Sequence, residues 1–397
     1  MSGPSPRRIW TFAAEQLRLK PYLRSPGDGR PQGDIAARDL YWSMLIGQIL
    51  RTSSFLGVEA LVGSSPLGAL KVGTTFGDDA LAYFTERLDP DITRQAAVQA
   101  ILRAKRNKAF DETAFIGLAV DGTTGGRCRQ QHCPLCRPYR NQEKETVGYR
   151  HHWAMISVVG CGLSLPFDVE PYGPGDSEYA ASQRLLKRAV ANLGPRFAGY
   201  VVADGEYATA PFLNAATAIG LPVVARLKGN VPELFAAARK RFQSQPPHQR
   251  FRDGNDRVEI WDADDFDPWE SLTWETVRVI RYRQIKPDGE VVEAYWLTNF
   301  SRRRVSGRSL YRMAKSRWEI ENQGFNDAKN RHGMEHICHH HPNSLLVQWL
   351  LTTLALTIER LYRLRFLHRG NHPLYSALNL VRRLWISLGR PARLNTS

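Results

Sequence analysis

The spacing of apolar residues predicts a helical region over residues 36–110. Apolar side chains such as Leu81, Phe84 and Leu88 recur every three to four positions, which places them on one face of a helix. Residues 1–35 are instead rich in Pro, Gly and Arg, and we predict that they form a mobile basic arm.

From residue 115 the pattern changes to short apolar runs separated by turn residues, which is typical of strands. Two of these runs, Phe115–Val120 and Gly199–Ala203, are each followed by Asp-Gly, as expected where a buried strand stops at a turn. Further strands are expected at 153–159, 163–169 and 222–227, and helices at 177–193 and 208–219. Strands and helices in this order predict a mixed α/β sheet flanked by helices, whose first part we assign to residues 111–230.

Residues 231–308 contain strand-like patterns and we predict a β-rich insertion there. The expected strands are 258–261, 276–285 and 291–300. Helical patterns return over 309–342, which we assign to the second part of the α/β core. They continue in a C-terminal helical region over 343–397.

The longest apolar stretch, Leu345 to Ile358, has 14 residues, fewer than the ~20 that a membrane-spanning helix needs. We therefore predict a buried core helix and no membrane partner. The N-terminus lacks the long apolar segment of a secretory signal, so we expect a cytoplasmic protein.

The chain is strongly basic, with 54 Lys and Arg against 39 Asp and Glu, a formal net charge of +15. Such a surplus favours a polyanion such as nucleic acid, because each neutralised phosphate releases counterions. We therefore expect association with the nucleoid. Part of this charge lies in three clusters: Arg103, Lys105, Arg106 and Lys108; Arg302, Arg303, Arg304, Arg308, Arg312, Lys315 and Arg317; and Arg360, Arg363, Arg365 and Arg369.

Two carboxylates, Asp121 and Asp204, follow the apolar runs described above. Residues at the ends of strands can lie close together in space although they are far apart in sequence. Each Asp-Gly pair could equally be only a turn. A third acidic position is Glu321, which shares a helical stripe with Arg317 and Phe325 at spacing i, i+4, i+8. An Arg–Glu pair of this kind is often only a surface ion pair.

The segment Arg317-Trp318-x-Ile320-Glu321-Asn322-x-x-Phe325-x-x-x-Lys329 resembles the C-terminal signature of insertion-sequence DDE transposases. The resemblance extends to residues 120–123, 202–207 and 224–230, and covers roughly residues 75–345 in consistent order. It implies an RNase H-like core in which a β-domain is inserted before the helix that carries the glutamate.

The resemblance also implies that Asp121, Asp204 and Glu321 form a catalytic triad that holds Mg²⁺ or Mn²⁺. Carboxylate oxygens are the ligands that such hard ions prefer, and two ions can serve the attacking and leaving oxygens of a phosphodiester. The implied DNA contacts are Arg317, Lys329, Asn322, Arg226 and Lys228. The implied partners are double-stranded DNA, as the element's terminal repeats and the target, and a second copy of the chain, since two ends must be brought together.

The family pattern often reads Tyr-x2-Arg-x3-Glu-x6-Lys, and this chain departs from it twice. Tyr311 lies six positions before Arg317 instead of three. Ala328 occupies the expected lysine position, and Lys329 follows one residue late, about 80° around a regular α-helix from Glu321.

A cysteine cluster over residues 128–152 suits a structural Zn²⁺. Cys128, Cys133 and Cys136 would supply three thiolates, with His152 or His132 as the fourth ligand. The alternative is three free thiols in an exposed loop. A second group over residues 336–341, rich in histidine, is expected to form an exposed turn near phosphate rather than a ligand cage.

Three functions are compatible with these patterns. The favoured hypothesis is a metal-dependent transposase that cuts and joins DNA at the ends of a mobile element. A second is a catalytically silent, transposase-derived DNA-binding protein. A third is a zinc-containing nucleic-acid-binding regulator in which the carboxylates are only turns and surface pairs.

Overall fold

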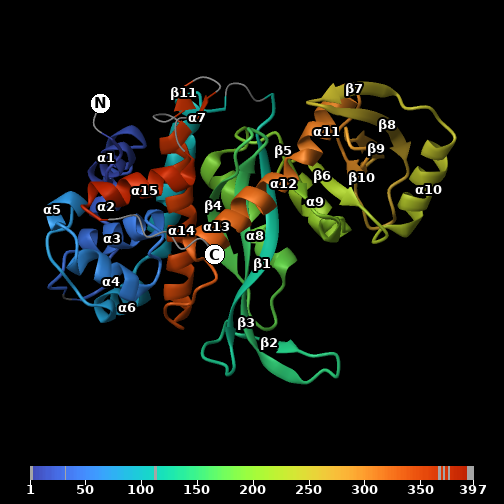
Figure 1. Ribbon diagram of the computed structural model, residues 1–397. Coiled ribbons are helices and arrows are strands. Elements are labelled where there is room, and N and C mark those ends of the chain that lie inside the picture. Colours follow the sequence, from blue (N-terminus) through green and yellow to red (C-terminus); the bar gives the residue numbers. More distant parts are fainter. Residues whose placement is uncertain are drawn as a thin grey trace.

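The apolar runs in the middle of the chain form one ten-stranded mixed sheet (Figure 1). The computed structural model describes residues 3–31, 33–110, 114–364, 368–369, 372–373 and 376–390. The sheet consists of β1 (Gly117–Cys128), β2 (Arg137–Arg140), β3 (Thr146–Val159), β4 (Leu165–Pro171), β5 (Tyr200–Ala203), β6 (Val223–Leu227), β7 (Gln249–Asp253), β8 (Asp256–Phe266), β9 (Val277–Ile285) and β10 (Val291–Thr298). Their order is β2-β3-β1-β5-β6-β10-β9-β8-β7, and β4 pairs with β3 outside this path.

Five of these strands have the RNase H-like arrangement implied by the resemblance. β3 and β4 form the predicted antiparallel hairpin, β3 pairs antiparallel with β1, and β1, β5 and β6 are parallel. Parallel neighbours need crossover connections, which helices usually supply. The helix α9 (Ala210–Ala218) connects β5 to β6, and α8 (Glu178–Leu193) leads from β4 into β5, both where the sequence predicts helices.

The predicted β-rich insertion extends the same sheet. It begins with α10 (Pro232–Gln243) and continues with β7 to β10. β10 pairs antiparallel with β6, so the insertion joins the core through backbone hydrogen bonds. Inside it, the buried Arg278 forms a two-pronged ion pair with the buried Asp262, at 2.8 and 2.7 Å. A charge buried this deeply is tolerated because it is fully paired.

The predicted N-terminal helical region packs against one long apolar helix, α14 (Pro342–Tyr362). The helices of this region are α3 (Ala37–Ile49), α4 (Phe55–Gly63), α5 (Leu67–Leu70), α6 (Asp78–Arg87) and α7 (Pro90–Arg106). α14 lies between them and β4 (Figure 1). By length and composition it could cross a membrane, but 94% of its most apolar stretch is buried inside the protein. This burial fits the predicted core helix.

The prediction of a mobile N-terminal arm was wrong for the residues that the structure describes. α1 (Pro6–Thr11), η1 (Phe12–Gln16) and α2 (Lys20–Arg24) pack into the core. Ile9, Phe12 and Leu23 are at most 2% exposed. Arg7, Arg8, Arg18 and Arg24 lie beside or between these apolar positions and are exposed, so the composition concealed a helical pattern.

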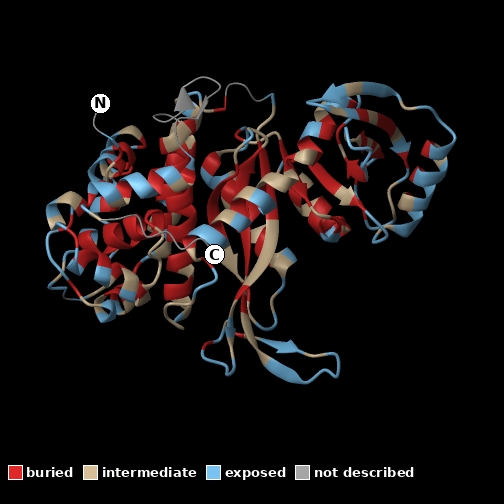
Figure 2. Ribbon diagram, in the orientation of Figure 1, coloured by how far each residue is buried: buried red, intermediate tan, exposed pale blue. Residues whose placement is uncertain are grey.

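The helical segment after the insertion is divided at Ser316. Its parts are α11 (Gly307–Lys315), α12 (Arg317–Glu319), η3 (Ile320–Phe325) and α13 (Asn326–His332). Ser316 is buried, and its hydroxyl lies 2.8 Å from the hydroxyl of Tyr200 on β5. After α14 come β11 (His368–Arg369), β12 (His372–Pro373) and α15 (Ala377–Ser387). Figure 2 shows the buried sheet interior and α14, and the exposed hairpin that carries β2.

The packed N-terminus makes Phe12 a test of the fold. Its ring centroid lies 5.3 Å from that of Tyr362 at the end of α14. We expect Phe12→Ala to lower the free energy of unfolding by about 3–5 kcal/mol, measured by urea denaturation. Leu56→Ala, at a position 66% exposed, should change it by less than about 0.5 kcal/mol. Equal stability of both variants would mean that the N-terminal segment is a mobile arm after all.

Candidate active site

The pairing of β1 with β5 brings two carboxylates to the same level of the sheet. Gly117 lies opposite Tyr200, and Ala119 lies opposite Val202. Continuing this parallel register by two residues places Asp121 level with Asp204. Because side chains alternate along a strand with a period of two, both carboxylates leave the same face of strands about 4.8 Å apart.

The two aspartates differ in their backbone setting. Asp204 follows the last residue of β5, as predicted. Asp121 does not end its strand, which corrects the prediction from Asp-Gly. β1 continues to Cys128, and Asp121 pairs with Met155 of β3. The apolar run stops at Val120 because the strand leaves the core there: residues 118–120 are buried, whereas residues 121–124 are partly exposed.

The helix that carries Glu321 is fixed against the hairpin of β3 and β4. The carboxylate of Glu319 accepts a hydrogen bond from the Gly160 backbone N–H at 2.9 Å. The side chain of Gln323 accepts one from the Ser164 backbone N–H at 3.1 Å. Ile320 is fully buried beneath the helix. These contacts turn the opposite face, with Arg317 and Glu321, toward the aspartates.

One guanidinium group joins all three carboxylates. Arg317 Nη2 lies 2.9 Å from Glu321 Oε2, and Arg317 Nη1 lies 3.8 Å from Asp121 Oδ2. Arg317 Nε lies 4.0 Å from Asp204 Oδ1. The three acidic side chains therefore converge on one point, although two come from the sheet and one from a late helix. Arg317 is only 13% exposed, whereas Glu321 is 50% exposed and faces solvent.

The environments of the two aspartates shift their pKa values in opposite directions. Burial raises the pKa of Asp121 to about 7, with Glu178 and Glu321 acting in the same direction and Arg317 opposing them. Burial alone would also raise the pKa of Asp204. The Gly205 backbone N–H, Lys228 and Arg317 outweigh it and lower that pKa below its ordinary value. A pair of acids with divergent pKa values in one place is typical of a functional site.

The sequence analysis missed a fourth carboxylate beside the triad. Glu178 starts α8, and the hydroxyls of Tyr172 and Tyr207 donate to its two oxygens at 3.0 and 2.7 Å. A Cβ at Gly122 would lie 2.0 Å from the carboxyl carbon of Glu178, so the glycine after Asp121 leaves room for this carboxylate. The Asp-Gly pattern marked the glycine, but nothing in the sequence connected it to Glu178.

A family model described as "Transposase DDE domain" matches residues 112–358, more than half of the chain. The chain belongs to this transposase family. No curated protein sequence matches the chain at a significant level. Among solved structures it resembles the piggyBac transposase, in a cryo-electron microscopy structure of its synaptic complex with hairpin DNA. The identity is 12% and the TM-score 0.45, over 99% of this chain and 83% of that chain.

The residues implied as DNA contacts of this transposase lie around the triad to different degrees. Lys228 is exposed and its Nζ lies 3.1 Å from Asp204 Oδ2. Asn322 is exposed next to Glu321. Arg226 lies on β6, and its guanidinium carbon lies 5.6 Å from the ring centroid of Trp296. Thus Lys228 and Asn322 border the carboxylates directly, whereas Arg226 lies on the sheet toward β10.

A π-helical turn explains the late position of Lys329. In η3 the backbone bonds run from i to i+5, which takes one more residue than an α-turn. The extra residue lies between Glu321 and Lys329 and turns the lysine back toward the sheet. Lys329 Nζ donates to the Thr124 carbonyl at 3.0 Å and lies 2.8 Å from Glu335 Oε1. Lys329 therefore contacts β1 three residues from Asp121.

Tyr311 lies outside the site. It is 1% exposed, and its hydroxyl donates to Asp253 of the insertion at 2.8 Å. Burial and this carboxylate raise its pKa. Tyr311 therefore joins α11 to the insertion and does not face the triad, consistent with its shifted spacing.

The structure shows that some residues of the basic clusters are exposed and that others are buried. Arg302, Arg303 and Arg304 are exposed. Arg360 is 4% exposed and bonds to Asp327 and to the carbonyls of Ser164 and Gln323, so it is a core residue rather than a phosphate contact. The side chains of Arg365 and Arg369 lie outside the described residues.

In the predicted zinc loop, the structure places His151 instead of His152 beside the cysteines. His151 and His152 point to opposite faces of β3, and His151 is the one that faces the cysteines. His152 packs toward Tyr172, with ring centroids 5.4 Å apart. Residues 336–341 were expected to form an exposed turn apart from any ligand cage, but His340 lies with Cys133, Cys136 and His151 in a group that could hold a metal ion.

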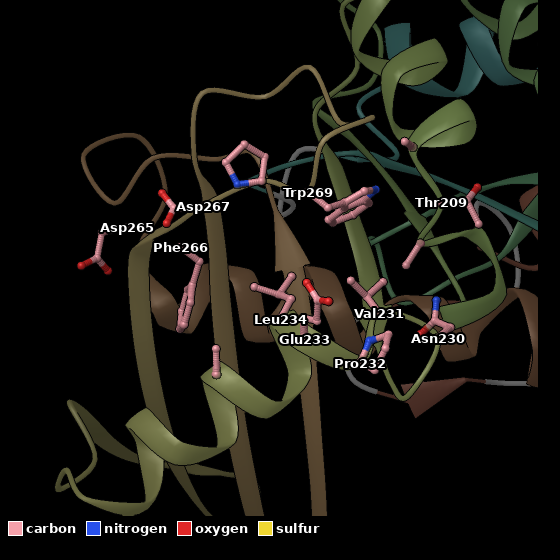
Figure 3. Close-up of a pocket in the computed structure, with 14 residues that line it drawn as sticks. Thr209, Asn230, Val231, Pro232, Glu233, Leu234, Asp265, Phe266, Asp267 and Trp269 are labelled. Atoms are coloured by element: carbon pink, nitrogen blue, oxygen red, sulfur yellow. The ribbon is translucent and has the colours of Figure 1, made fainter.

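A pocket near the site has the wrong charge for DNA. It lies between the segment 208–210, the start of α10 and the end of β8, and Figure 3 shows Glu233, Asp265 and Asp267 around it. None of the three converging carboxylates lines it. The candidate active site is instead the open surface around Arg317.

The raised pKa of Asp121 predicts a pH-dependent stability. The folded chain binds the proton of the Asp121 carboxyl more tightly than the unfolded chain does. The stability that this proton contributes is therefore present below about pH 4 and is lost as the pH rises through about 7. Relative to the wild type, Asp121→Asn should therefore gain up to about 3 kcal/mol between pH 5 and pH 8. Urea denaturation in EDTA measures this difference. The exposed Asp265→Asn should show no such gain, and a pH profile of Asp121→Asn parallel to the wild type would contradict the assignment.

Proposed function

We propose that the chain is an active DDE transposase that cleaves DNA strands at the ends of a mobile element and joins them to a target. The observation that supports this most directly is the contact of Asp121, Asp204 and Glu321 with one guanidinium group. Membership of the transposase family makes DNA the expected substrate. The basic balance of the chain, +15 overall, agrees with this substrate.

The donor set fits Mg²⁺ or Mn²⁺. All three side chains offer carboxylate oxygens, and the structure holds them around one cationic group, Arg317. Hard divalent ions prefer such oxygens and leave sites for water and phosphate. Bound there, a pair of ions would neutralise charge on the attacking and leaving oxygens. The Cys and His cluster would suit a different metal, because thiolate and imidazole favour zinc.

The chain's own residues would position the DNA. Arg317 presents a planar, fork-shaped donor that matches phosphate oxygens, and it can exchange its contacts with the carboxylates for contacts with the backbone. Lys228, exposed beside Asp204, would bind a neighbouring phosphate. Asn322, Arg226 and Lys329 are weaker candidates, and Lys329 would first have to leave Thr124 and Glu335.

The remaining partners follow from the reaction. Two element ends must be held together, and we propose a homodimer that binds both terminal repeats and then the target. The helical region over residues 36–110 is the proposed second DNA contact, with Arg106 and Lys108 exposed at the end of α7. A catalytically silent descendant of the family is the alternative, and cleavage assays distinguish the two.

Asp204→Ala tests the proposed reaction. Loss of this carboxylate removes oxygens from the metal site, and we expect Mg²⁺-dependent cleavage of a labelled duplex with the element's terminal repeat to fall at least ~100-fold. Binding of the duplex, measured in EDTA by fluorescence anisotropy, should change little. Asp288→Ala, at an exposed turn of the insertion, is the matched control and should cleave normally. Undiminished cleavage by Asp204→Ala would rule out the triad.

A further inference from the structure

Four side chains from three distant segments meet away from the carboxylates. Cys133 and Cys136 come from the loop between β1 and β2, His151 comes from β3, and His340 comes from the segment between α13 and α14. One ligand atom from each lies within 4.8 Å of the others. Such a meeting of two thiols and two imidazoles has no role in the proposed DNA chemistry.

The distances match a tetrahedral zinc centre. Zinc binds thiolate at about 2.3 Å and imidazole at about 2.0–2.1 Å, which sets S···S edges near 3.8 Å and S···N edges near 3.5 Å. The Cys133 and Cys136 sulfurs are 3.6 Å apart. Nε2 of His151 lies 3.2 Å from the first and 3.4 Å from the second. The sulfurs are too far apart for a disulfide, whose S–S bond is about 2.05 Å.

Burial makes a bound metal the better account of these polar groups. His151 is fully buried, and Cys133 and Cys136 are 6% and 1% exposed. Within the described part of the chain, Nδ1 of His340 has no hydrogen-bond partner, and Nε2 of His151 faces the two cysteine sulfurs. Burying imidazoles that are poorly satisfied is unfavourable unless another interaction compensates. Coordination of a zinc ion by two thiolates and two imidazoles would supply that interaction.

We propose that Cys133, Cys136, His151 and His340 bind one structural zinc ion. Four protein ligands close the site, which is typical of structural rather than catalytic zinc. Cys128 lies next to this set, with its sulfur 3.7 Å from Nε2 of His340, and His132 is exposed beside them. These two are neighbours of the ligands and not ligands in this assignment.

The zinc site would attach the part of β1 and β3 near the β2–β3 hairpin to the segment between α13 and α14. Gly125 of β1 pairs with His151 of β3, four residues along the strand from Asp121. A side chain at Gly126 would collide with Ile337, which shows how closely residues 335–340 approach β1. Zinc would therefore fix the base of the projecting β2–β3 hairpin (Figure 1) and the path between α13 and α14.

Metal analysis tests the ligand set. We expect protein purified without added metal to contain about one zinc per chain by inductively coupled plasma mass spectrometry. Cys136→Ala and His340→Ala should each lose most of it. His152→Ala and Cys161→Ala should keep it, because His152 faces the opposite side of β3 and Cys161 lies in the β3–β4 turn. Wild-type protein without zinc, or full zinc in His340→Ala together with loss in Cys128→Ala, would overturn the assignment.

Cobalt substitution tests the site without any variant. Co²⁺ exchanged into the wild-type chain should give the intense visible bands of tetrahedral cobalt and thiolate-to-cobalt charge-transfer bands. Weak bands of six-coordinate cobalt without charge transfer would contradict the proposal. Removing zinc with a chelator should also make residues 128–150 more sensitive to limited proteolysis. None of these readouts depends on DNA cleavage, so they stand or fall separately from the proposed transposase activity.

Discussion

Parallel pairing between β1 and β5 holds Asp121 and Asp204 on adjacent strands, where two negative charges repel each other unless a cation lies with them. Arg317 is that cation in this structure, and Glu321 joins from the same helix one turn later. The site thus depends on where the helix lies relative to the sheet. The hairpin of β3 and β4 fixes this position through Glu319 and Gln323.

More distant parts of the fold also stabilise the position of the helix with Arg317 and Glu321 relative to the sheet. The insertion continues the sheet through β6, the strand next to β5, so it stiffens the edge from which Asp204 and Lys228 emerge. α14 packs on β4 and carries Arg360, which holds the carbonyl of Gln323 beneath the helix. The proposed zinc would add a third attachment, at the chain leaving α13.

The sequence predicted the sheet and most helices, because their apolar periodicity is local. The resemblance to DDE transposases pointed to Asp121, Asp204 and Glu321, and the structure brings these three side chains together around Arg317. The N-terminal helices escaped notice because Ile9 and Phe12 follow a short run of Gly, Pro and Arg residues, Gly3 to Arg8, that dominates the composition there. Lys329 could not be placed, since a regular α-helix turns it away from Glu321 and the π-helical turn depends on tertiary packing.

The metal cluster shows a second limit. Strand alternation predicts that His151 and His152 face opposite sides, but it does not say which side faces the cysteines. His340 lies almost 190 residues away in the sequence, and only the packing of residues 335–340 against β1 brings it near. Glu178 likewise depends on a long-range approach to Gly122. Contacts of this kind leave no local periodic signal.

The central claim is that the three converging carboxylates form a binding site for divalent cations. Crystals of the protein grown with Mn²⁺ and measured at the manganese absorption edge would locate the ions by anomalous scattering. The account predicts anomalous peaks within coordination distance, about 2.2 Å, of oxygens from Asp121 and Asp204, with Arg317 turned away from them. Peaks elsewhere, or none beside these side chains at saturating Mn²⁺, would contradict it.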